Sequence, residues 1–227
     1  TSGPDAGEIF DADIVFNGRD FRFSVGAPGT IRPPSIDLQA TATHEIGHLL
    51  GIDHTGLMGP ASRRPVMNPF DNSETSGAAR VLKPDDAAAV GSLYPSEAFS
   101  GMGRVSGTVK KPDGTGAFGV QVVAYGEDGN FVVSGLSGHR TGRGGSGEYA
   151  LLGLPPGRYT VGIEPLKGQV TSANFGGIFN RSFDTDFSPK FYNNAPDRTQ
   201  AELLRVAAGQ EVPDIHFSTG LFPPGFP

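Results

Sequence analysis

The chain contains no cysteine, so disulfide bonds contribute nothing to its stability. It also has no apolar run near the roughly 20 residues that span a bilayer, and the opening TSGPDAGEIF has neither the charged start nor the apolar core of a signal peptide. Positive charge is scarce, because 18 Lys and Arg stand against 24 Asp and Glu. The net charge of −6 argues against a nucleic-acid binder, which would normally carry a basic patch. Because the opening does not resemble a signal peptide, we expect this sequence to be a processed form if the protein is secreted.

Three of the five histidines fall within one short stretch, HEIGHLLGIDH at residues 44–54. His44 and His48 are four residues apart, so on a helix they share one face and form a bidentate metal clamp. A continuing helix would carry His54 roughly 15 Å along the axis, out of reach of the same ion. Gly51 is predicted to end the helix and turn the chain back, since glycine takes the left-handed conformation at little cost.

Three histidine ligands leave the fourth position of a tetrahedral zinc ion open for water, as in catalytic rather than purely structural sites. Zinc lowers the pKa of that water to near 7, and a neighbouring carboxylate can take its proton. Glu45 is the predicted general base, since it follows the first ligand and lies beside the metal. An HExxH pair alone also arises by chance in helices, but the register of Gly51 and His54 favours one zinc site. His139 and His216 lack ligand spacing and are predicted to be ordinary surface or strand histidines.

The extended motif resembles the HExxHxxGxxH signature of the metzincin zinc endopeptidases. Thr55, the next residue, is close to the serine found there in matrixins, and RPVMNPF resembles the Met-turn, with Met67 beneath the metal. LKPDDAAAVGSLYP at residues 82–95 resembles the last helix of the matrixin catalytic domain. One departure is that Asn68, Pro69 and Phe70 follow the methionine, where many metzincins carry a tyrosine.

This resemblance covers about residues 8–95 and implies roles for the residues that match the family pattern. It implies that Asp86 anchors other parts of the domain, although plain complementation of the helix dipole is the alternative. It also makes calcium binding plausible, with Asp11 and Asp13 as candidate ligands. A plain core methionine is the alternative interpretation of Met67.

Local patterns in this half predict a few elements. Residues 8–17 alternate apolar and polar side chains and are predicted to form a strand, as are residues 21–25. The metal helix is predicted to begin near residues 36–39, with Asp37 in its first turn and with an apolar face packed on a sheet. That face comprises Leu38, Ala42, Ile46, Leu49 and Leu50. A second helix begins at Pro84 and ends before Pro95.

From Arg104 onward the sequence changes to short strands separated by turns, which favours a β-sandwich. SGTV, GVQVVAY, GEYALLGLPPGRYTVGIEP and AAGQEVPDIHF resemble the carboxypeptidase regulatory-like, prealbumin-like domain. EVPDIHFS is predicted to be one final strand, and Glu148 and Asp214 to be ordinary surface acids. Residues 95–103 are predicted to be a linker, which divides the chain into residues 1–98, residues 103–219 and a tail at 220–227. The predicted fold class is α+β, a truncated metzincin-type zincin domain followed by an all-β sandwich.

Together these patterns predict a secreted, extracellular, bacterial zinc metalloendopeptidase that acts on protein or peptide substrates. The alternative is a non-catalytic structural or binding protein built on an incomplete metzincin core. Only 43 residues precede His44, enough for two short strands, whereas a matrixin domain begins with several strands and a long helix. We therefore expect a processed or partial form, whose sheet is completed by an upstream fragment or by a neighbouring copy. The second arrangement would give oligomers or filaments.

Overall fold

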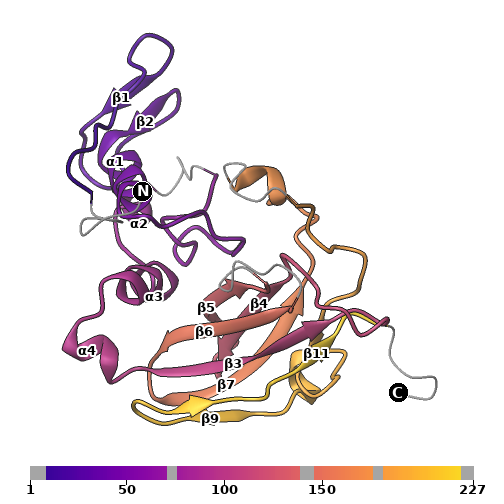
Figure 1. Cartoon of the computed structure of the whole chain (residues 1–227). Coiled ribbons are helices and arrows are strands. Elements are labelled where there is room, and N and C mark those ends of the chain that lie inside the picture. The colour runs from indigo at the N-terminus through magenta and orange to yellow at the C-terminus, as the bar shows by residue number, and fades with distance from the viewer. Residues whose placement is uncertain (1–8, 71–75, 139–145, 176–180, 221–227) are drawn as a thin grey trace.

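The computed structural model describes residues 9–70, 76–138, 146–175 and 181–220. Strands predominate and helices are few and short, in agreement with the predicted mixed fold. Figure 1 shows the helices and a small sheet on one side and the larger sheets on the other. We call residues 9–100 the amino-terminal region and residues 103–220 the β region.

The amino-terminal region is built around one helix and a two-stranded sheet. β1 (Arg22–Ser24) and β2 (Ser35–Asp37) pair in parallel, and α1 (Leu38–Leu49) follows β2 at once. Asp37 is the N-cap of α1 and does not lie in its first turn as predicted, because its carboxylate accepts hydrogen bonds from the backbone N–H groups of Gln39 and Ala40. It also forms a buried ion pair with Arg80 at 2.8 Å. The remaining helices are α2 (Ser76–Ala79), α3 (Pro84–Leu93) and α4 (Glu97–Ser100).

Three other local predictions for this region are wrong. No strand forms among residues 9–17; Phe10 and Val15 are exposed, and no strand in the described part of the chain pairs with this segment. The interval between Pro95 and Gly103 contains the short α4 rather than only a linker, since Ser96 caps that turn through its hydroxyl. The buried residues of α1 are Ala40 and Gly47, whereas Ile46 of the predicted apolar face is exposed.

The described residues of the β region form two sheets. In one sheet β3 pairs with β6 in antiparallel fashion and with β10 and β11 in parallel; in the other, β4 pairs with β5 and β7, and β7 with β8 and β9. The strand bounds are β3 (Gly103–Lys110), β4 (Gln121–Gly126), β5 (Phe131–Leu136), β6 (Glu148–Leu154), β7 (Gly157–Glu164), β8 (Lys190–Phe191), β9 (Leu204–Val206), β10 (Glu211–Val212) and β11 (Phe217–Ser218). In the described residues, the 3₁₀ turns η2 (Ser172–Asn174) and η3 (Arg198–Gln200) lie between strands. The prealbumin-like identity of this region stays a prediction.

The final strand predicted over EVPDIHFS is broken into β10 and β11. Asp214 lies between them with a φ of 64°, a left-handed conformation that interrupts the extended chain. Both short strands nevertheless pair with β3 in parallel, so the segment still covers one edge of that strand.

One hydrophobic core joins the two sheets and extends into the amino-terminal region. Val105, Val122, Leu151 and Val161 come from four different strands of both sheets and are fully buried. Ala88 of α3 belongs to the same cluster, and α3 lies against β5 and β6 (Figure 1). The predicted division into independently folding parts stays a prediction, but the two regions are packed against each other.

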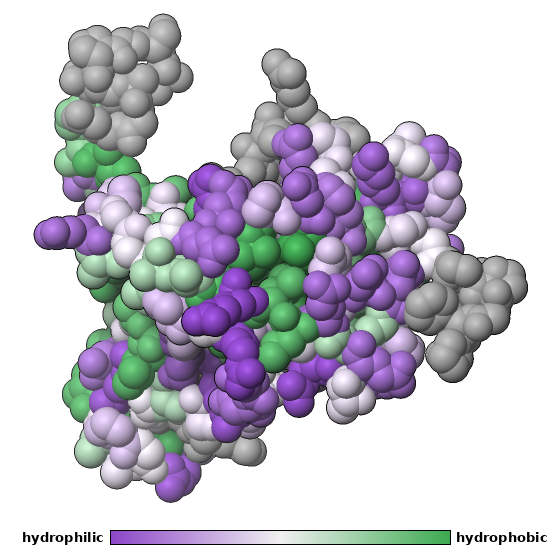
Figure 2. Space-filling view, turned by 90° about the horizontal axis from the view of Figure 1, so that it is seen from below, coloured by the Kyte–Doolittle hydropathy of each residue, from purple (hydrophilic) through white to green (hydrophobic). Residues whose placement is uncertain are grey.

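The surface mixes polar and apolar residues. On the face shown in Figure 2, apolar residues gather near the centre and hydrophilic residues border them. No helix in the described ranges is long and apolar enough to cross a membrane.

Candidate metal centre

The three histidines of the motif meet at one point. The Nε2 atoms of His44, His48 and His54 are each 3.1 Å from the other two. Three nitrogens bound tetrahedrally to one zinc ion at about 2.0–2.1 Å would be about 3.3–3.4 Å apart. The observed triangle is close to that spacing, so the three imidazoles fit one ion of this size.

The opposite nitrogen of each ring contacts a backbone carbonyl. His44 Nδ1 lies 2.7 Å from the Val66 oxygen, and His48 Nδ1 lies 2.9 Å from the Ile52 oxygen. His54 Nδ1 contacts the oxygen of Asn174. A carbonyl only accepts, so each Nδ1 must carry the proton and donate it. The three Nε2 lone pairs then face one another, an arrangement that a cation stabilises.

The pKa of His44 agrees with this protonation pattern. Burial lowers the pKa of the His44 imidazole, and the neighbouring His48 and His54 lower it further, whereas the hydrogen bond to Val66 and the Glu45 carboxylate raise it. A neutral imidazole is the form that ligates a metal. The environment of His44 therefore favours the ligating form.

The end of α1 brings His54 back to the pair on the helix. Gly51 follows the helix with a φ of 88°, and its N–H donates to the carbonyl of His48. The N–H of Ile52 donates to Gly47, one turn earlier. This left-handed glycine reverses the chain so that His54 approaches His44 and His48 from the side.

Met67 lies against the turn of α1 that carries both helical histidines. Its side chain is 3% exposed, and its sulfur lies only 2.3 Å from the place where a Cβ on Gly47 would stand. Asp86 holds the Met67 turn, because its carboxylate accepts from the N–H groups of Val66 at 2.9 Å and Met67 at 3.0 Å. The same carboxylate accepts from Lys83 N–H at 2.7 Å at the start of α3. Asp86 thus ties α3 to the residue whose carbonyl orients His44.

Glu45 lines two cavities beside the histidines. One, of about 290 Å³, is shared with His44 and is lined largely by apolar residues, among them Phe21, Ile36, Val66 and Phe70. The other, of about 440 Å³, is shared with His48 and is bordered by residues 12–17. The Glu45 carboxylate is therefore reachable from the spaces next to both helical histidines.

The other candidate residues lie outside this cluster. Asp11 and Asp13 are exposed, and in the described residues only the three histidines form a group of three or more potential ligands, so calcium there stays a prediction. His139 lies outside the described residues. His216 is exposed and bonds to Thr108, as expected for a surface histidine. Glu148 and Asp214 are exposed acids.

Two residues near the site were not expected from the sequence. Asn174 contributes a carbonyl, and a backbone acceptor carries no signature in the sequence. Asp85 is buried and accepts from Ser134 N–H at 2.6 Å, and burial raises the pKa of its carboxyl to about 6. A double aspartate after Pro84 resembles ordinary dipole complementation, so the burial of Asp85 against β5 gave no signal in the sequence.

Comparison with known proteins shows that the amino-terminal region is similar in sequence to the matrixins. The family model described as Matrixin matches residues 4–95. Karilysin of Tannerella forsythia is 36% identical over 91 residues, which are 40% of this chain and 16% of that protein. The match thus spans under a fifth of the relative's length, and less than half of this chain. The similarity supports a matrixin-like metalloprotease in the amino-terminal region.

Proposed function

We propose that this chain is a secreted zinc metalloendopeptidase that hydrolyses peptide bonds, with His44, His48 and His54 as the zinc ligands. The observation that carries the proposal is the triangle of Nε2 atoms at 3.1 Å, each ring being oriented by a carbonyl at Nδ1. The zinc ion, when bound, supplies a Lewis acid that polarises a carbonyl and acidifies water.

Glu45 is the general base in this proposal. It is adjacent to a ligand in the sequence and lines the cavities on both sides of the helical pair. It accepts the proton of the attacking water and returns it to the leaving amine, which is the role of a carboxylate in general acid–base catalysis. Met67 fills the space against Gly47, in the turn of α1 between the two helical histidines.

The apolar cavity beside Glu45 fits an apolar side chain of a peptide. Its walls include three phenylalanines and several aliphatic residues, and it adjoins His44. A substrate whose large apolar side chain enters this cavity would have its scissile bond near the three histidines. We expect peptides with such a residue next to the cleaved bond to be preferred.

The test is a comparison of Glu45→Gln with the unchanged protein. Elemental analysis should find about one zinc per chain in both, whereas peptidase turnover should fall by about 10²–10⁴-fold in the variant. Glu148→Gln, an exposed acid in β6, removes the same charge and should leave turnover unchanged. An unchanged turnover in Glu45→Gln would show that Glu45 is not the base. If the unchanged protein contained no zinc, the proposed zinc site itself would be refuted.

One observation favours the second candidate, a non-catalytic protein that assembles by strand addition. In the described residues, the sheet of the amino-terminal region has only β1 and β2, three residues each, and Val25 beside β1 is 81% exposed. An open edge is a template for another strand, from an upstream fragment or a neighbouring copy. Sedimentation should then show oligomers that Val25→Lys reduces, with zinc content unchanged. A monomer with ordinary peptidase turnover would rule this candidate out.

A further inference from the structure

The acceptors that orient the three histidines come from different parts of the chain. Val66 and Ile52 lie in the amino-terminal region, as the histidines do. The acceptor for His54 is Asn174, which lies 120 residues away, in the β region, beyond the stretch that matches the matrixins. We propose that the β region is a structural part of the metal centre, because the Asn174 carbonyl positions the third ligand. This inference rests on the proposed zinc site.

The carbonyl of Asn174 is held by a compact turn. In η2 the side chain of Asn174 accepts from the N–H of Thr171 at 2.9 Å, and its N–H donates back to the Thr171 carbonyl at 3.0 Å. The next residue, Phe175, is 2% exposed and packs in a second cluster with Phe118 and Phe183. The turn is thus fixed at both its ends, so its carbonyl has a defined direction.

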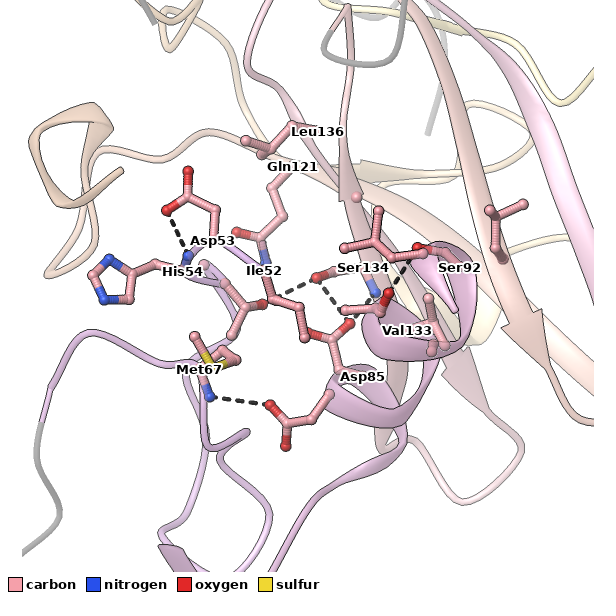
Figure 3. A pocket seen from close by; sticks show the side chains of 18 of the residues that line it. Ile52, Asp53, His54, Met67, Asp85, Ser92, Gln121, Val133, Ser134 and Leu136 are labelled. Carbon is pink, nitrogen blue, oxygen red and sulfur yellow. Dashed lines mark hydrogen bonds between the residues drawn. The ribbon is translucent and has the colours of Figure 1, made fainter. Parts of the chain in front are cut away.

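The chain after His54 is also held against the β region. The Thr55 hydroxyl lies 3.2 Å from that of Ser134 in β5, and Ser134 in turn bonds to Asp85. Gly56 lies so close to Gln121 that a Cβ there would stand 1.9 Å from the amide oxygen. These residues line a cavity of about 380 Å³ between the two regions. Figure 3 shows His54 at one end of it, with Ser134 and Asp85 on the opposite side. Residues 54–56 therefore bridge the two regions.

His54 needs this support more than the other two ligands do. His44 and His48 project from α1, whose backbone fixes their direction, whereas His54 lies in the loop that follows Gly51. A loop side chain relies on outside contacts for its ring orientation, and loss of such an outer partner typically lowers metal affinity about 10–100-fold. The expected effect of disturbing η2 lies in this range, although η2 contributes no ligand atom.

The experiment compares two variants of Asn174 in the full chain. Asn174→Ala removes the side-chain acceptor that holds η2, while Asn174→Asp keeps an oxygen at that place. The matched control is Asp197→Ala, which loosens η3, a 3₁₀ turn of equal length whose cap bonds to Thr199 and not to a histidine. Zinc affinity is measured by competition with a chelator, and the histidine Nδ1–H signals are measured by NMR of the zinc-loaded protein.

We expect Asn174→Ala to bind zinc about 10–100-fold more weakly and to lose the protected Nδ1–H signal of His54 while those of His44 and His48 remain. Asn174→Asp and Asp197→Ala should resemble the unchanged protein. Wild-type affinity with all three signals in Asn174→Ala would overturn the inference.

If Asn174→Ala does not fold, a measurement on the unchanged protein still tests the inference. Its zinc-loaded form must show three protected imidazole N–H signals, and an unprotected His54 proton would contradict the role of Asn174. Failure of the unchanged protein to bind zinc at all would instead overturn the proposed function, so the two outcomes are distinct.

Discussion

Replacing Asp85 by Asn should stabilise the protein, and the gain should depend on pH. Asp85 is 8% exposed, and burial raises the pKa of its carboxyl from 3.8 to about 6. Its oxygen accepts from the N–H and hydroxyl of Ser134. An asparagine oxygen can accept both hydrogen bonds from Ser134, so the substitution keeps these two contacts and removes the buried charge.

The magnitude follows from the shift. One pKa unit corresponds to about 1.4 kcal/mol, so a shift of about two units costs about 3 kcal/mol when the group is ionised in the folded protein. For an acid whose folded pKa is raised, the folded state binds more protons between the two pKa values, so stability falls as pH rises through that window. The cost is nearly absent below about pH 4, grows between about pH 4 and 6, and is complete above about pH 6.

The assay is denaturant unfolding of both proteins at several pH values, with chelator present so that metal release does not contribute. The difference in unfolding free energy should be under about 1 kcal/mol at pH 4 and about 3 kcal/mol at pH 7–8, in favour of Asp85→Asn. Glu148→Gln, exposed on β6, is the control for the change of net charge. A difference that does not change with pH, or a less stable Asp85→Asn at neutral pH, would refute the reasoning.

Two further substitutions test the support of the Met67 turn. Asp86→Asn replaces at least one oxygen that accepts from the N–H of Val66, Met67 or Lys83, so unfolding free energy should fall by at least about 1.5–3 kcal/mol. Zinc affinity should fall with it, and an unchanged melting temperature and affinity would contradict the role of Asp86. Gly47→Ala should destabilise, because overpacking against Met67 costs about 1–3 kcal/mol and the helix propensity gain is only about 1 kcal/mol. In a Met67→Ala background the same change should stabilise, and a stabilising Gly47→Ala with Met67 intact would show that the contact is loose.

The metal helix was predictable from sequence because its signals are local. Histidines four residues apart need only a helix to share a face, and a left-handed glycine such as Gly51 acts within one turn. The helix at Pro84 and most strands of the β region follow from equally local cues, namely proline position and alternation bounded by turns. Elements that depend on interactions within a few residues of sequence could therefore be predicted.

The failures concern residues whose environment is set by distant chain. The alternation from Phe10 to Phe16 meets the local criterion for a strand but has no partner strand among the described residues; Phe16 instead packs edge-to-face on Phe23, with ring centroids 5.4 Å apart. Ile46 was assigned to a buried face, whereas the buried residues of α1 are the small Ala40 and Gly47, and Gly47 lies against Met67. Hydrophobic periodicity predicts that a helix has an apolar face, but the segment that packs on the helix determines which face is buried.

The distribution of the core explains why the β region matters to the site. In the described residues, both clusters of buried apolar side chains are built from the β region, with Ala88 as the one buried member from the amino-terminal side. Met58, which follows the third histidine by four residues, packs on the second cluster, the one that contains Phe175 beside Asn174. A region with two three-residue strands has little apolar surface of its own to bury, so much of its order must come from this shared packing. The Asn174 carbonyl that we propose to orient the His54 ring adjoins Phe175 of this cluster, so disturbing the cluster should loosen the metal centre before the fold itself is lost.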